Sequence, residues 1–267
     1  MKKAIVTGHS RGLGAAIAEA LLSRGFAVLG LARQRNDELA RYQPANLSQV
    51  ALDLADPAAL SQWLDGGALR EFLAGAEAAL LVNNAGVVAP IGALGTQDVG
   101  AVARAVTLNV AAPLMLASAF AAATDAGAAE GGAAAESRSD AARRAPTADR
   151  RILHVSSGAG RNALASWSVY CATKAALDHH ARTVALDGTP GLRICSLAPG
   201  IIDTDMQADI RGTPPERFPQ WERFQELKRD GALTTPEDCA RRLVDYLLSE
   251  VFGRVPVADL REVAAAG

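Results

Sequence analysis

The sequence predicts an α/β protein: a doubly wound parallel sheet with helices on both faces, in a single domain. Short apolar runs alternate with helical patterns, which favours parallel strands joined by crossover helices. The first apolar run also leads through a glycine-rich loop into the first helical pattern, as in phosphate-binding turns. With 267 residues, the chain is long enough for one such domain, 1–267, with a well-buried core.

The expected elements follow one another along the chain. Compact apolar runs predict strands, in order, over Lys3–Thr7, Ala27–Ala32, Val50–Asp53, Ala79–Asn83, Arg151–Ser156 and Arg193–Ala198. Helical spacing between these runs predicts helices over Ala15–Arg24, Pro57–Leu73, Val99–Thr124, Ser166–Leu186 and, after the last strand, Pro236–Ser249. Strand and helix therefore alternate almost throughout, which places the helices on both faces of the sheet.

The charge balance limits the partners. There are 27 Lys and Arg against 29 Asp and Glu, a formal net charge of −2, so nucleic acid and anionic membrane surfaces are not expected partners. A small neutral or anionic ligand suits this composition better. The three cysteines, Cys171, Cys195 and Cys239, have no C-x-x-C spacing, which predicts reduced, packed thiols without a disulfide framework or a zinc site.

The expected location is cytoplasmic. The N-terminal MKKAIVTGHS is too short in its apolar part for a signal peptide and instead predicts a first strand. No segment approaches the roughly 18 uninterrupted apolar residues of a membrane helix, so no membrane partner is expected.

Two segments depart from the alternation. The stretch 125–150, DAGAAEGGAAAESRSDAARRAPTADR, has no large apolar residue and predicts a flexible surface insertion, either a tolerated loop or an arm that touches a partner. The stretch 205–233 combines prolines, aromatic residues and charges, and predicts either a substrate-binding lid or a plain surface helix. In a lid, Phe218, Trp221 and Phe224 would supply apolar walls.

The loop TGHSRGLG, Thr7–Gly14, is the first functional candidate. Glycines at positions 8, 12 and 14 permit a tight turn, close backbone approach to a ligand and close helix packing, while the helix N-terminus offers free N–H groups to a phosphate. The position between strand and helix favours a dinucleotide site over a merely tight turn.

The end of the second strand indicates which dinucleotide binds. An acidic residue there would hold a ribose 2′-hydroxyl, whereas arginine accommodates a 2′-phosphate. Here Ala32 and Arg33 follow one another with no carboxylate, and Arg11 could face the same phosphate. This pattern predicts NADP(H). The alternative is that Arg33 and Arg35 are only solvated.

Tyr170 and Lys174 lie four residues apart in SVYCATK, so they are neighbours on one helix face. A nearby positive charge favours an ionised phenol, which would make the tyrosine usable as an acid near neutral pH. The alternative is a packed tyrosine beside a solvated lysine.

Several motifs together resemble the short-chain dehydrogenase/reductase family, over roughly residues 2–206. The glycine loop resembles its TGxxxGxG, and NNAG at 83–86 resembles its motif after the fourth strand. Asn109, Ser157, Tyr170 and Lys174 match its catalytic residues, and Ser157 lies thirteen residues before Tyr170, as is usual in the family. The resemblance and the loop together imply a Rossmann-type fold and cofactor contacts from Thr7, Gly8, Ser10, Arg11, Gly12, Leu13, Gly14, Arg33, Asp53, Leu54, Asn83, Ala85, Gly86, Tyr170, Lys174, Pro199, Gly200, Ile202 and Thr204.

The resemblance also implies a role for each catalytic residue. Tyr170 would donate the proton, Ser157 would hold the carbonyl, and Lys174 would lower the pKa of the phenol and bridge the nicotinamide ribose. Asn109 resembles the residue whose backbone kink supports a water next to the lysine, although it could be an asparagine with a local hydrogen bond. His9 is expected to face solvent, and His179 and His180 lack metal-like partners, so no metal is expected.

The expected function is NADPH-dependent reduction of a small-molecule carbonyl, or the reverse oxidation of an alcohol. The tail LKRDGALTTPEDCARRLVDYLL is similar to the sepiapterin reductase and benzil reductase branch, which suggests an aromatic or diketone-like carbonyl. The alternatives are a 3-oxoacyl or sugar-type reductase and a redox sensor that binds NADP(H) without turnover. The resemblance further implies a homodimer or homotetramer through the helices after the fourth and fifth strands. The small residues of the alanine-rich segments 101–123 and 172–186 would permit close packing there, and the alternative is burial of the same faces within a monomer.

Overall fold

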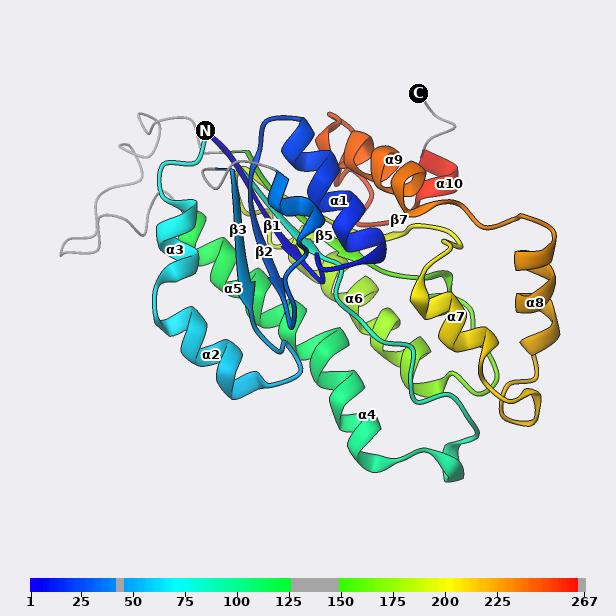
Figure 1. Cartoon of the computed structure of the whole chain (residues 1–267). Helices are drawn as coiled ribbons and strands as arrows, with labels where there is room; N and C mark the ends of the chain where they lie inside the picture. The colour runs from blue at the N-terminus through cyan, green and yellow to red at the C-terminus, as the bar shows by residue number, and fades with distance from the viewer. Residues whose placement is uncertain (42–45, 126–148, 264–267) are drawn as a thin grey trace.

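The computed structural model describes residues 1–41, 46–125 and 149–263. Seven parallel strands form one sheet in the order β3-β2-β1-β4-β5-β6-β7 (Figure 1). The strands are β1 Lys2–Thr7, β2 Ala27–Ala32, β3 Leu47–Ala51, β4 Ala78–Asn83, β5 Asp149–Val155, β6 Leu192–Ala198 and β7 Val257–Asp259. Because the order reverses between β1 and β4, a crevice opens at the carboxyl ends of these strands. The predicted doubly wound, single-domain fold is confirmed.

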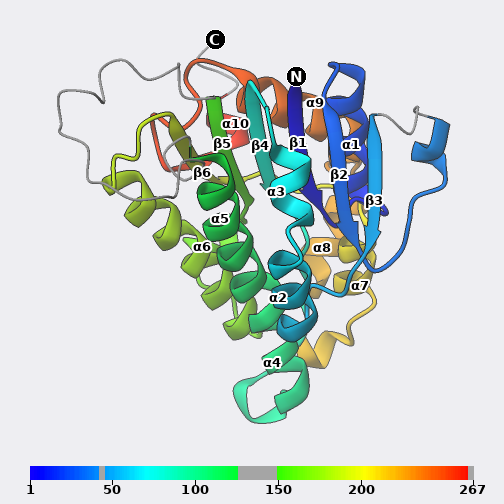
Figure 2. The same ribbon diagram turned by 90° about the vertical axis from the view of Figure 1, so that its left-hand side faces the viewer.

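Helices cover both faces of the sheet (Figure 2). One face carries α1 (Gly12–Ser23), α9 (Pro236–Leu248) and α10 (Leu260–Val263), and the other α2 (Pro57–Asp65), α3 (Ala68–Leu73), α4 (Val99–Val106), α5 (Ala112–Thr124) and α6 (Ser168–Leu186). The remaining helices, α7 (Asp205–Arg211) and α8 (Trp221–Arg229), lie beyond the carboxyl edge of the sheet (Figure 1). Short helical turns are η1 (Glu38–Arg41), η2 (Leu94–Thr96), η3 (Thr107–Ala111), η6 (Gly158–Gly160) and η7 (Pro215–Arg217).

The apolar core consists of two layers, one on each face of the sheet. The strands are buried on both faces, as in β2, where every residue is buried. This explains why they appear in the sequence as continuous apolar runs. A third apolar cluster lies at the carboxyl edge and includes Trp167, Tyr170 and Phe218. The fold therefore places a separate apolar wall beside the crevice.

Several predicted boundaries were wrong. The third strand is Leu47–Ala51 and not Val50–Asp53, because the burial pattern of this edge strand is weaker. The predicted helix 57–73 is divided into α2 and α3 by Gly66 and Gly67, the latter at φ +81°. The helix predicted from Ser166 begins at Ser168, because Ser166 has a φ of +69° that no helix accepts.

Two further differences concern the segments without regular patterns. The predicted insertion 125–150 extends too far: its last two residues start β5, while 126–148 lie outside the described residues. The strand β7 was not predicted, since its three residues, which pair with Ser196–Ala198 of β6, are too few to show a pattern. The segment 205–233 contains α7, η7 and α8, joined by short loops.

One expectation about membranes needs correction. In the described part of the chain, Val99–Thr124, which runs through α4, η3 and α5, is long and apolar enough to cross a membrane by length and composition alone. The alanines make the stretch apolar even though polar residues interrupt it. The same test also selects core helices, and α5 packs on the sheet through Leu116 and Phe120, both fully buried.

Candidate active site

The helix α6 carries Tyr170 and Lys174 on its buried face, at the carboxyl edge of the sheet. Their exposed fractions are 7 % and 4 %. The ammonium of Lys174 lies 5.7 Å from the centre of the Tyr170 ring and donates a hydrogen bond to the carbonyl of Val155 at 2.8 Å. The two residues are therefore neighbours, as their spacing predicted, and the buried lysine excludes the alternative of a solvated one.

Ser157 reaches the same place from the end of β5. It is the N-cap of η6, where its Oγ accepts a hydrogen bond from the Ala159 N–H at 3.2 Å. Its side chain also hydrogen-bonds Tyr170 and lowers the pKa of the phenol. The structure thus brings together Ser157 and Tyr170, thirteen residues apart in sequence.

The pKa of Tyr170 differs from the prediction. Burial raises it to about 12, and the hydrogen bond from Ser157 only partly opposes this effect. Burial likewise lowers the pKa of Lys174 to about 8. The sequence predicted that Lys174 would lower the pKa of the phenol, but its ammonium is directed to the Val155 carbonyl and the low-polarity surroundings dominate.

Asn109 lies in a π-helical turn, Thr107–Ala111, between α4 and α5. Its amide accepts a hydrogen bond from the Val87 N–H at 2.9 Å and donates to the Val87 carbonyl at 2.8 Å and to Thr173 Oγ1 at 3.1 Å. The backbone irregularity that the resemblance implied is present. Asn109 also fixes the chain after β4 to α6, a positioning contact that the sequence did not predict.

A cavity of about 810 Å³ follows the crevice along the carboxyl edge. Fifteen of the predicted cofactor residues are among those that line it: Gly8, Arg11, Gly12, Leu13, Gly14, Arg33, Asp53, Leu54, Ala85, Gly86, Tyr170, Lys174, Pro199, Ile202 and Thr204. The other four, Thr7, Ser10, Asn83 and Gly200, do not line it. The second asparagine of the NNAG motif, Asn84, lines the wall instead of the first.

Two of these four residues, Thr7 and Asn83, make hydrogen bonds within the protein instead. Thr7 is buried, and its hydroxyl accepts hydrogen bonds from the N–H groups of Asn84 and Ala85, both at 2.9 Å. The Asn83 amide donates to His154 at 3.1 Å, and His154 in turn contacts His180 at 3.0 Å. Because strand residues alternate between faces, Asn83 points into the layer under α5 and Asn84 alone reaches the crevice.

The loop and helix α1 suit a bound dinucleotide. A Cβ on Gly14 would lie 2.1 Å from the Gly8 carbonyl oxygen, so only glycine permits this close packing. The N-terminus of α1 has no side-chain cap and no acidic residue in its first turn, so its N–H groups are available to an anion. These features fit the pyrophosphate of a nicotinamide dinucleotide.

Arginines and carboxylates lie at the rim of this cavity. Arg11 pairs with Asp205 at 3.0 Å across the mouth, and Asp53 pairs with Arg104 at 3.0 Å. Arg33 is exposed and lines the wall. Burial raises the pKa of Asp53, but the Ala55 N–H, Arg104 and, least of all, Arg33 lower it, and the net shift is downward. The ion pairs of Arg104 and Asp205 were not predicted, because nothing local in sequence connects their partners.

A second cavity of about 440 Å³ lies on the other side of Tyr170, which lines both. Ser157, Trp167 and Phe224 also line it. The predicted apolar walls are only partly present: Phe218 is fully buried and stacks on Trp167 with ring centres 5.2 Å apart, and neither Phe218 nor Trp221 lines the two cavities. Phe218 therefore supports the wall from behind.

Three other expectations can be compared with the structure. His9 does not face solvent: it is fully buried, and its Nε2 lies 2.8 Å from Gln49 Oε1. Cys195 and Cys239 are buried free thiols, and Cys171 is a half-buried one that packs on the aromatic cluster. The described residues contain no cluster of His, Cys, Asp and Glu that could hold a metal ion.

This fold, with a crevice beside a Ser, Tyr and Lys group, is typical of a nicotinamide-dependent oxidoreductase. Residues 2–215 match the family model described as short chain dehydrogenase, so the chain belongs to this family. It is similar to a benzil reductase ((S)-benzoin forming) of Bacillus cereus, 32 % identical over 98 % of this chain and 100 % of the relative. It is also similar to the sepiapterin reductase of Mus musculus, 30 % identical over 93 % of this chain and 92 % of the relative.

A solved structure agrees with the fold. A short-chain dehydrogenase/reductase from Burkholderia vietnamiensis is 50 % identical and has a TM-score of 0.64, with 97 % of this chain and 98 % of that chain covered. The chain is thus an oxidoreductase that uses a nicotinamide cofactor and acts on carbonyl or alcohol groups of small molecules.

Proposed function

We propose that the protein is an NADPH-dependent carbonyl reductase in which Tyr170 is the general acid. The observation that carries this proposal is the position of Tyr170 between the two cavities, with Lys174 on the wall of the larger and Ser157 on the wall of the smaller. The larger cavity would hold the dinucleotide and the smaller one the carbonyl substrate, so that the phenol lies where the two ligands meet.

Ser157, Tyr170 and Lys174 would each have a different role in carbonyl reduction. When bound, the nicotinamide cofactor supplies the hydride that carbonyl reduction needs. Negative charge develops on the carbonyl oxygen, and the hydroxyls of Ser157 and Tyr170 would stabilise it by hydrogen bonds. Burial keeps the phenol of Tyr170 protonated at neutral pH, so it can donate its proton to that oxygen. The ammonium of Lys174 adds a positive charge beside the reacting atoms.

The proposed substrates are aromatic ketones and 1,2-diketones. Support comes from the aromatic side chains at the second cavity, Trp167 and Phe224, and from the names of the relatives, benzil reductase and sepiapterin reductase. We would measure NADPH oxidation with aromatic ketones, 1,2-diketones, 3-oxoacyl thioesters and keto sugars. Turnover should be greatest on a diketone. Preference for a thioester or sugar would refute this substrate class, and NADPH binding without any turnover would favour a sensor.

Arg33 is the residue that we expect to select NADPH. Replacement of Arg33 by Asp removes the guanidinium and puts a carboxylate where it repels a 2′-phosphate and accepts from a ribose hydroxyl. We expect the ratio of kcat/KM for NADPH to that for NADH to fall by roughly 10- to 100-fold, as for the loss of a charged hydrogen bond. The control is Arg35→Asp, at an exposed arginine away from the cavity wall. An unchanged ratio in Arg33→Asp would refute this assignment.

We also propose a homo-oligomer formed through the outer faces of α4, α5 and α6. In support, only 39 % of the most apolar window of Val99–Thr124 is buried within one chain, and Val99 and Leu186 are 81 % and 87 % exposed. Light scattering should give the mass of a dimer or tetramer, and a monomer at micromolar concentration would contradict the proposal.

A further inference from the structure

The helix α6 buries a third ionisable side chain, Asp178, one turn beyond Lys174. It is 1 % exposed and lies on the same face of the helix as Tyr170 and Lys174. A buried carboxylate is costly unless its oxygens are hydrogen-bonded and its charge is paired. Its contacts therefore show what offsets the cost of burying it.

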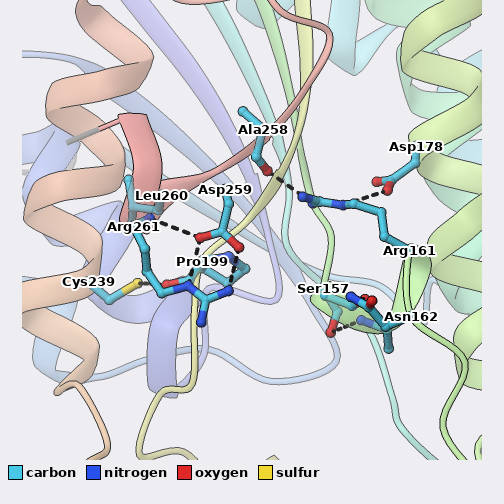
Figure 3. Close-up of polar contacts among 12 residues, drawn as sticks. Ser157, Arg161, Asn162, Asp178, Pro199, Cys239, Ala258, Asp259, Leu260 and Arg261 are labelled. Atoms are coloured by element: carbon cyan, nitrogen blue, oxygen red, sulfur yellow. Dashed lines mark hydrogen bonds and ion pairs between the residues drawn. The ribbon is translucent and has the colours of Figure 1, made fainter. Parts of the chain in front are cut away.

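Both oxygens of Asp178 have partners. Its Oδ1 accepts hydrogen bonds from the hydroxyls of Ser156 and Ser196, both at 2.7 Å. Its Oδ2 accepts from Nε of Arg161 at 3.2 Å, and Nη2 of Arg161 donates to the Ala258 carbonyl at 3.0 Å (Figure 3). Three donors, one of them on a positively charged guanidinium, thus satisfy the buried carboxylate.

These contacts connect Asp178 to the segment that precedes Ser157 and to the carbonyl that holds Lys174. Ser156, which donates to Asp178, directly precedes Ser157, and Val155, which accepts from Lys174, directly precedes Ser156. Arg161 ends the short turn η6 that Ser157 begins, and its guanidinium bridges Asp178 and the Ala258 carbonyl (Figure 3). Asp178 is thus attached to the segment that positions both the serine and the lysine.

The charges near Asp178 and Lys174 come from several elements. On β7, the buried Asp259 acts electrostatically with Arg161 and is paired with Arg261 at 2.7 Å. Lys174 faces Tyr170 on its own helix and His154 on β5, and Asp178 faces Arg161 and the thiol of Cys195 on β6. Burial lowers the pKa of His154 to about 3 and raises that of Cys195 to about 11, so both are neutral at pH 7.

Asp178 is therefore the charge that acts directly on Lys174, and Arg161 is the charge paired with Asp178. Burial lowers the pKa of Lys174, and the negative charge of Asp178 partly offsets this by raising it.

We propose that Asp178 is a positioning residue whose buried carboxylate, held by Arg161 and Ser156, keeps Lys174 charged beside Tyr170 and fixes the loop of Ser157. The inference rests on the proposed function, in which Lys174 acts with Tyr170. Asp178 touches neither cavity wall, so its influence passes through these neighbours.

The test is the pH profile of carbonyl reduction for Asp178→Asn. Reduction requires the proton of Tyr170 and the charge of Lys174, and both are lost as pH rises, as one coupled pair. A negative charge favours the protonated form of both groups, so its removal lowers the pH at which activity is lost. We expect the basic limb of the pH profile of kcat/KM to move to lower pH by about one unit. At a given pH on that limb, kcat/KM should therefore fall about tenfold. Asparagine is isosteric and can still accept from both serines.

Arg161→Gln supplies the opposite change. Removal of the guanidinium leaves the charge of Asp178 unopposed, so the basic limb should move up. Asp187→Asn, at an exposed carboxylate at the end of α6, is the control and should leave the profile unchanged. If Asp178→Asn fails to fold, the direction of the shift in Arg161→Gln decides alone.

The outcomes separate the inference from the proposed function. Shifts in opposite directions support the role of Asp178. Lower kcat in both variants with an unmoved basic limb would mean that Asp178 serves the fold only, which overturns the inference. If the unmodified protein reduces no carbonyl although it binds NADPH, the proposed function itself fails, and the inference with it.

Discussion

Tyr170→Phe should reduce kcat for carbonyl reduction by about 10³-fold, within the range that positioned acid catalysis provides, while NADPH binding stays within about twofold. The variant removes only the phenol oxygen. The ring keeps its edge contact with Trp167, at a centre distance of 5.3 Å, so the fold and the cavities should be unchanged. Steady-state kinetics gives kcat, and quenching of protein fluorescence gives the NADPH affinity.

Tyr246→Phe is the matched control, because Tyr246 is also buried but lies on α9 with its hydroxyl 3.7 Å from the Cys195 sulfur. We expect it to retain turnover within a fewfold. Substantial turnover in Tyr170→Phe, or an equal loss in both variants, would be incompatible with Tyr170 as the acid.

Gly14→Ala should damage both the stability and the cofactor site. Its Cβ would lie 2.1 Å from the Gly8 carbonyl oxygen and 2.5 Å from the Asn84 amide nitrogen, closer than atoms can approach. The turn must open and α1 must move away from β4. We expect a loss of about 3 kcal/mol in the free energy of unfolding, as for overpacking of a close contact, together with about 100-fold weaker NADPH binding.

Urea unfolding and a dinucleotide titration measure the two effects. Gly95→Ala is the control, since a Cβ there has no atom within 4 Å and the residue lies in the exposed turn η2. Native stability and native affinity in Gly14→Ala would show that the glycine is not required for close packing.

Local patterns in the sequence were sufficient for much of this protein. Apolar runs predicted six of the seven strands that the described residues form, the third with wrong bounds, because most of these strands are buried on both faces and appear as continuous apolar runs. The four-residue spacing of Tyr170 and Lys174 placed them on one helix face, since helix geometry is local. The glycines of the loop identified the crevice because a tight turn against a helix requires them.

Other features depend on contacts between distant parts of the chain. Whether Asn83 or Asn84 reaches the crevice depends on the register of β4, and the position of Phe218 depends on its packing against Trp167. No local pattern indicated that His9 would be buried against Gln49, forty residues later.

The sequence by itself determined the order of most strands and helices, the phosphate loop and the placement of Tyr170 and Lys174 on one helix face, because these follow from short-range patterns, whereas Ser157 was indicated by its resemblance to a family motif. Only the tertiary structure decided the pKa of Tyr170 and the burial of Asp178 among Ser156, Ser196 and Arg161. The physical reason is that a local pattern specifies backbone geometry, whereas desolvation and charge pairing depend on which distant groups surround a side chain.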